Sequence, residues 1–161
     1  MESFLTPPYT INENQLIEKN AVYDNGNKRF HVVYLDTAVI KAEGWNEDGT
    51  EIKDFIVQRK PQFKGGMKGW KRYLENHLNA NVAAQAGAPR GIYTVKVEFD
   101  VDKEGNVSNV KLKEVPENCF ECGDEAIKII ARGPKWEPAI QFGKPVLYRA
   151  FQFISFSVVG Y

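Results

Sequence analysis

Residues 93–113 read YTVKVEFDVDKEGNVSNVKLK, and this stretch decides the fold. In residues 93–101 every second side chain is apolar and the side chains between them are polar or charged. This alternation predicts a β-strand with one buried face and one solvated face. Residues 102–105, with glycine in last place, predict a four-residue turn, and the apolar positions of residues 107–112 predict a returning strand. A β-hairpin therefore stands at the centre of the C-terminal part of the chain.

Amphipathic helices are predicted on both sides of this hairpin. Residues 66–79 place apolar side chains at helical spacing, and residues 121–132 do the same, with acidic residues in the first turn and Gly133-Pro134 after the last. Residues 79–90 predict a loop with room for one helical turn. The apolar face of the first helix is predicted to consist of Met67, Trp70, Tyr73, Leu74, His77 and Leu78.

The end of the chain predicts a long last strand over residues 146–158, which are rich in aromatic and β-branched side chains. Its apolar residues occupy both strand phases. Either a β-bulge near Gln152 resets the register, or both faces of the strand are covered, with the N-terminal hairpins as one source of cover. The first phase holds Ile154, Phe156 and Val158, and the second holds Leu147, Phe151 and Phe153.

Residues 21–58 predict a small antiparallel β unit. Asp24-Asn25-Gly26-Asn27 separates two apolar runs, and Asn46-Glu47-Asp48-Gly49 lies between a run at 38–45 and another at 52–57. Asn-Gly and Asp-Gly favour the positive φ values of tight hairpin turns. Residues 1–20 have no sustained periodicity and predict an extended arm with at most one short helix, near residues 13–19.

The composition narrows the possible binding partners and the possible cellular compartment. The chain has 161 residues, is 43% hydrophobic, and carries 21 basic and 21 acidic side chains, so no charge excess indicates binding to nucleic acid or to an anionic membrane. No run reaches the ~20 apolar residues of a membrane helix. Because Met1-Glu2-Ser3-Phe4 lacks the layout of a signal peptide, we expect a cytosolic chain or a trimmed one.

Three motifs in the C-terminal part agree in order with one known family. They are Pro61-Gln62-Phe63-Lys64-Gly65-Gly66 with the aromatic residues that follow, the hairpin at 97–107, and Pro134-Lys135-Trp136-Glu137-Pro138-Ala139 with the Gly-Lys-Pro-Val of residues 143–146. Residues 61–161 resemble the C-terminal domain of TonB proteins, in a Bacteroidetes-like branch. In the N-terminal part, Lys41-Ala42-Glu43-Gly44-Trp45 followed by Asp48-Gly49 resembles the hairpin repeats of the MORN type.

The TonB resemblance implies an α+β fold, a three-stranded antiparallel sheet with two helices on one face. It also implies a non-enzymatic module of the periplasm or cell envelope that binds an extended peptide of an outer-membrane transporter and couples energy to transport. In this family the last strand is a sheet edge, which a partner peptide can join as an added strand. The partner-binding residues predicted here, chosen because they lie off the helix-facing phase, are Leu147, Arg149, Phe151 and Phe153.

The sequence departs from the family pattern in two places. Members that transduce energy carry a membrane helix and a proline-rich spacer, whereas this chain has only Pro7-Pro8. The Tyr-Pro pair that the family usually has between the first helix and the first strand is missing, and Ala80-Asn81 stand near that point. An alternative function is therefore a structural or assembly protein that forms a homodimer through its last strand.

Cys119 and Cys122 allow a third hypothesis, a thiol oxidoreductase. A helix N-terminus lowers a thiol pKa, but the neighbouring carboxylates oppose thiolate formation. The residues favour a local disulfide or inert thiols. No cofactor and no metal is predicted, since the only histidines, His31 and His77, fall in other elements.

Overall fold

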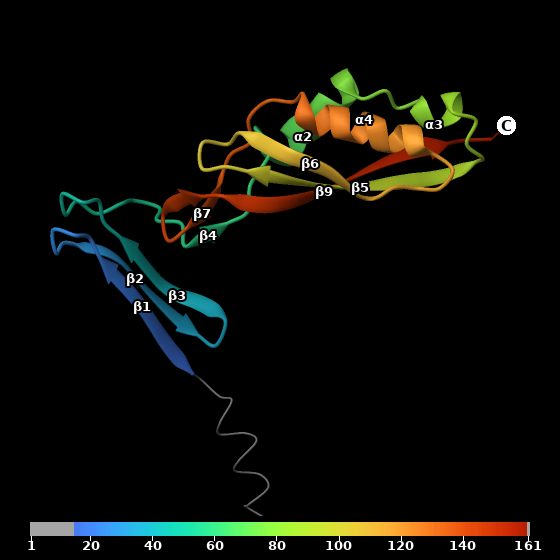
Figure 1. Ribbon diagram of the computed structural model, residues 1–161. Coiled ribbons are helices and arrows are strands. Elements are labelled where there is room, and N and C mark those ends of the chain that lie inside the picture. Colours follow the sequence, from blue (N-terminus) through green and yellow to red (C-terminus); the bar gives the residue numbers. More distant parts are fainter. Residues whose placement is uncertain (1–14, 161) are drawn as a thin grey trace, which may run out of the picture. The chain divides into compact units, whose positions relative to one another are not determined.

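The alternating stretch forms the central strand of a three-stranded sheet. The computed structural model describes residues 15–160, and in it β5 (Gly91–Val101) lies between β6 (Val107–Glu114) and β9 (Tyr148–Val158), as Figure 1 shows. Both pairings are antiparallel. One face of β5 is buried throughout and forms the centre of the core: Tyr93, Val95, Val97, Phe99 and Val101.

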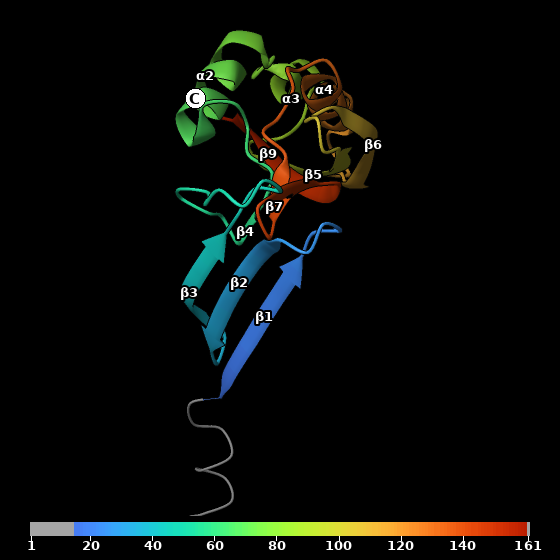
Figure 2. The ribbon, with the colours of Figure 1, turned by 90° about the vertical axis from the view of Figure 1, so that its left-hand side faces the viewer.

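Helices cover one face of this sheet. Figures 1 and 2 show α2 (Gly66–His77) and α4 (Phe120–Ala131) on the same side, with the single turn α3 (Val82–Gln85) near the far end of β9. The apolar stripe of α4 is buried against β5 and β6, and α2 buries Trp70. The predicted α+β fold, a three-stranded antiparallel sheet with two main helices on one face, is confirmed.

The last strand is regular, so the first of the two alternatives, a β-bulge near Gln152, is wrong. β9 pairs with β5 through eleven consecutive residues, from Gly91 opposite Val158 to Val101 opposite Tyr148. The register shifts occur instead between β5 and β6. The two apolar phases of β9 are the two faces of one strand, and the phase that faces away from the helices remains about half exposed.

Three short strands form a second sheet, of order β4-β7-β8: β4 (Gln58–Arg59), β7 (Ala139–Gln141) and β8 (Lys144–Val146). The β7–β8 hairpin turns at Phe142 and Gly143, both of which have positive φ. The predicted long last strand is present, but it begins at Tyr148 and not at Val146, because the hairpin uses Val146.

The N-terminal sheet has the order β1-β2-β3, with β1 (Leu16–Val22), β2 (Lys28–Leu35) and β3 (Ala38–Gly44) all antiparallel. The turn before β2 has the positive φ of Gly26 that the Asn-Gly pair predicts, and Gly49 has the same conformation in the Asp-Gly turn. Residues 55–57, predicted as a strand, are not one; the pairing after this turn is a single bridge between Trp45 and Glu51.

The sequence allowed at most one short helix near residues 13–19, and the described residues of that range, from 15 on, form no helix. Leu16 pairs with Leu35, and the pairing continues to Val22. Most side chains of β1 are exposed, so they leave no hydrophobic period in the sequence, and backbone pairing with β2 decides the conformation. Residues 1–14 of the predicted arm lie outside the described part of the chain.

The described chain divides into two compact units. One contains residues 15–59 together with 141–144, and the other contains residues 60–140 and 145–160. The segment 141–144 thus belongs to the N-terminal unit, where the ring of Phe142 stacks on Phe30 with centroids 4.3 Å apart.

Candidate functional site

The free edge of the main sheet is β9. In the order β6-β5-β9, β5 is the one strand that pairs with β9 among residues 15–160. An edge strand presents backbone N–H and C=O groups that another chain can pair with. The other edge of this sheet is β6, whose pairing with β5 is interrupted by two register shifts.

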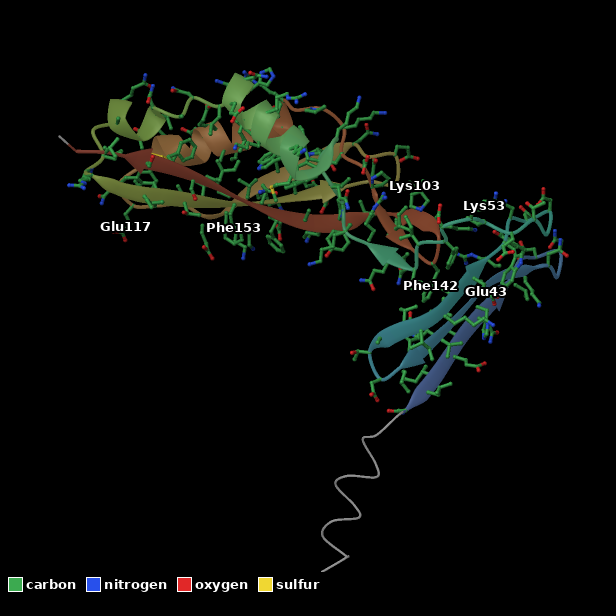
Figure 3. All side chains as sticks on the ribbon, turned by 180° about the vertical axis from the view of Figure 1, so that it is seen from behind. Glu43, Lys53, Lys103, Glu117, Phe142 and Phe153 are labelled. Carbon is green, nitrogen blue, oxygen red and sulfur yellow. A yellow bond between two sulfur atoms is a disulfide. The ribbon has the colours of Figure 1, made fainter. Side chains whose placement is uncertain are left out.

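Three of the four predicted binding residues lie together on the open face of β9. Figure 3 shows Phe153 on the side of the sheet away from the helices, and Phe151 and Arg149 share its phase. Phe151 is 48% exposed and Phe153 55% exposed. The ammonium of Lys96 lies 4.7 Å from the ring centroid of Phe151 and 5.6 Å from that of Phe153. The two rings and this cation form one aromatic surface beside the edge.

Leu147 does not belong to this strand. It is 66% exposed and lies between β8 and β9, outside both. The sequence shows a continuous β-prone run here, and the short hairpin that ends at Val146 gives no separate hydrophobic signal. Leu147 is therefore outside the edge strand, but it directly precedes Tyr148, the first residue of β9.

Arg149 is held by a carboxylate of the neighbouring strand. Its Nε donates to Oδ1 of Asp100 at 3.0 Å, and Asn109 donates through Nδ2 to the other oxygen at 2.9 Å. These hydrogen bonds, the one from Arg149 first, hold the pKa of Asp100 below its ordinary value. The same contact raises the pKa of Arg149. The guanidinium is thus oriented within the sheet before any partner arrives.

On the helix side, β9 borders a hollow of about 340 Å³ that the sequence did not reveal. The aromatic rings of Phe63, Trp70 and Trp136 form its base, with centroid separations of 5.2–5.7 Å. Met67 lies at its rim, and Gln152 is the residue of β9 that lines it. The lining is completed by Pro61, Gln62 and Gly66.

One prediction about these residues needs correction. The sequence places Met67 on the apolar face of its helix, but the side chain is 81% exposed. Helical spacing put it at the margin of the apolar stripe, where periodicity does not distinguish a core residue from the rim of a groove. Trp70 and Trp136 are both buried in the core, and both also line the hollow.

The wall of the hollow is fixed by backbone contacts. Gln62 and Glu137 exchange two hydrogen bonds, of 3.0 and 2.8 Å, and the amide of Trp136 donates to the oxygen of Gly105 at 2.9 Å. A Cβ on Gly105 would lie 2.1 Å from the oxygen of Trp136, so glycine is required where the chain comes this close. The hairpin turn at Gly105 therefore holds Trp136 in position.

Cys119 and Cys122 are joined by a disulfide, with an S–S distance of 1.98 Å, and both are fully buried at the start of α4. Within residues 15–160, no group of three or more His, Cys, Asp or Glu side chains could hold a metal ion. Nor is any helix of that region long and apolar enough to cross a membrane.

Comparison with known proteins assigns the C-terminal part of the chain. The family model of the Gram-negative bacterial TonB protein C-terminal matches residues 90–158, a range that begins one residue before β5 and ends with β9. It leaves out α2, α3 and everything before them, so the resemblance noted for residues 61–89 stays a prediction. A search of curated proteins and a search of solved structures found no match.

The matched range contains the complete sheet β6-β5-β9, the helix α4 and the β7–β8 hairpin, and it includes the sequence motifs at 97–107 and 134–146 on which the resemblance rests. The family match therefore supports a TonB C-terminal domain segment over residues 90–158 of this chain.

Proposed function

We propose that this chain is a binding module of the bacterial cell envelope, in which the edge of β9 takes up an extended peptide of an outer-membrane transporter as a fourth strand. The family is one of non-enzymatic domains that couple energy to transport across the envelope. The observation that carries the proposal is the position of β9 at the end of the order β6-β5-β9, with a regular register along its whole length.

Backbone pairing alone would give a weak complex. Five or six added hydrogen bonds at about 1 kcal/mol net each are opposed by association costs of at least about 4 kcal/mol. Side-chain contacts must therefore supply most of the affinity, and the exposed rings of Phe151 and Phe153 are the contacts available on the open face. A weak and reversible complex suits a coupling protein that must release its partner.

The experiment is a titration of the ¹⁵N-labelled protein with a seven-residue peptide of alternating threonine and valine, followed by NMR and amide hydrogen exchange. We expect shifts and slower exchange in β9, and little change in β6. The control is the same peptide with alternate backbone nitrogens methylated, which removes the donors and should abolish binding. Equal binding of the methylated peptide, or shifts centred on β6, would disprove strand addition at this edge.

A second candidate function is assembly of this chain with its own copy through the same edge. The exposed phenyl rings of Phe151 and Phe153 beside the outer edge of β9 favour it, because pairing with a second copy at this edge would cover the edge and the rings. Sedimentation equilibrium separates the two proposals. A mass that rises from monomer to dimer with concentration, and a variant Phe151→Lys that stays monomeric, would support the dimer. A monomer at all concentrations would rule it out.

A further inference from the structure

The hollow beside Gln152 lies where a side chain of an added strand would point. Gln152 belongs to the phase of β9 that faces the helices, together with Ala150 and Ile154. A strand added at about 4.8 Å from β9 places its own helix-facing side chain directly opposite such a residue. One side chain of the peptide would therefore meet the hollow formed by Met67, Trp70 and Trp136.

The chemistry of the hollow selects an apolar side chain. Its base is a cluster of three aromatic rings, and the flexible thioether of Met67 stands exposed at its rim. Methionine adapts its shape to a ligand at little cost. A bulky aliphatic or aromatic side chain would cover Met67 and the exposed parts of the ring cluster, whereas a polar side chain would lose its water without finding a partner.

The charge beside the hollow is mainly positive. Residues 60–77, which contain α2, carry five Lys and Arg side chains and one carboxylate, Glu75, and residues 145–160, which contain β9, carry no carboxylate. The nearest carboxylate of the wall is Glu137, whose backbone pairs with Gln62. None of the cations of residues 60–74 forms an ion pair with a carboxylate in the described part of the chain. These cations are Lys60, Lys64, Lys68, Lys71 and Arg72.

Part of this charge lies across α2 from the hollow at Met67. A second hollow, of about 480 Å³, lies on the other flank of α2 and is lined by Lys64, Lys68 and Arg72. Phe63 lines both hollows, so the basic hollow and the apolar hollow are neighbours. Unpaired cations beside a docking groove favour a partner with carboxylates, which they attract and orient.

We propose that α2 and β9 together form a selective groove for an extended peptide that carries one bulky apolar residue toward α2 and acidic residues on either side of it. The inference rests on the proposed strand addition and specifies its partner. The backbone of the peptide pairs with β9, its apolar residue fills the hollow at Met67, and its carboxylates face the cations of α2.

The probe is the peptide Glu-Thr-Glu-Thr-Leu-Thr-Glu-Thr-Glu, in which the leucine and the glutamates share one strand face. Its affinity for the full chain is measured by NMR titration and compared with two matched peptides. Replacing leucine by serine should weaken binding about 5- to 20-fold, from the apolar area lost. Replacing the four glutamates by glutamines should weaken it and remove most of its dependence on salt.

Substitutions in the protein give the complementary test. Met67→Ser, at an exposed position, should abolish the preference for leucine over serine. The control Phe120→Ser removes another exposed apolar side chain, from α4, and should leave the preference unchanged. Lys68→Gln with Lys71→Gln should reduce the preference for glutamate, whereas Lys113→Gln on β6 should not.

The outcomes distinguish failure of strand addition at β9 from failure of the selective groove alone. If all three peptides slow amide exchange in β9 with equal affinity, strand addition stands and the selective groove is overturned. If none of them affects β9, strand addition fails and the groove fails with it. A leucine preference that survives Met67→Ser would also overturn the groove.

Discussion

Gly105 shows how one residue of the hairpin turn determines the shape of the candidate site. Its φ of +90° is unfavourable for other residues, and its missing Cβ leaves room for the oxygen of Trp136. The ring of Trp136 in turn forms the base of the hollow beside β9. A turn that the sequence predicts from composition alone is therefore also a support of the binding surface.

We expect Gly105→Ala to destabilise the protein by about 2–4 kcal/mol, because the strained φ costs about 1–2 kcal/mol and the clash with Trp136 adds to it. Urea unfolding measures the loss. Gly87→Ala is the matched control, since Gly87 also has positive φ, at 78°, but has nothing within 4 Å of the added Cβ. If the two variants lose equal stability, the close approach of Trp136 does not matter.

Asp100 should make stability depend on pH. Its pKa is depressed in the folded state by the hydrogen bonds from Arg149 and Asn109. The stabilisation is therefore fully present above the unfolded pKa of about 3.9 and is lost as the pH falls through the folded pKa. Urea unfolding between pH 6 and pH 2.5 should show a smaller loss in Asp100→Asn than in the unchanged protein. Parallel curves for the two proteins would contradict this.

Among the elements, β5 and α4 could be predicted from the sequence because their periodicity reflects a single buried face. β1 could not, since its side chains are mostly exposed and its conformation comes from pairing with β2. The β7–β8 hairpin was missed because its strands have three residues each, too few for a period. The helical spacing of apolar residues also predicts a core position for Met67, because this spacing does not show whether another element packs against that part of the helix.

The disulfide at the start of α4 should stabilise the fold modestly. Because it closes a loop of only about four residues, the loss of chain entropy in the unfolded state corresponds to about 2 kcal/mol. We expect dithiothreitol to lower the melting temperature of the protein and to leave the double variant Cys119→Ser with Cys122→Ser unaffected. Identical melting curves with and without the reductant, once reduction is verified by mass, would contradict the expected contribution.

At the scale of the whole molecule, the chain enters the N-terminal unit a second time. Residues 141–144 belong to that unit, whereas the residues on both sides of them belong to the C-terminal unit. The amides of Phe142 and Gly143 donate to the oxygens of Val57 and Ile56, at 2.6 and 2.9 Å, and the ring of Phe142 packs on Phe30. A segment that follows α4 in the sequence thus completes the packing of strands that precede α2.

Removal of residues 1–59 should therefore have a local effect. We expect the amides of residues 142 and 143 to lose their protection from hydrogen exchange, because their acceptors are gone, while those of β5 stay protected between β6 and β9. Hydrogen exchange measured by NMR on the shortened chain tests this. Collapse of protection in β5 as well would show that the C-terminal sheet depends on the N-terminal unit.

The same segment has a consequence for synthesis on the ribosome. Domains generally fold as they emerge, N-terminal part first. Here the first sheet leaves the exit tunnel long before Phe142 does. The rings of Phe30 and Phe55 therefore lack their contacts with residues 142 and 143 until nearly the whole polypeptide has been made. Translational pausing or a chaperone acting in that interval would affect the N-terminal half of the molecule first.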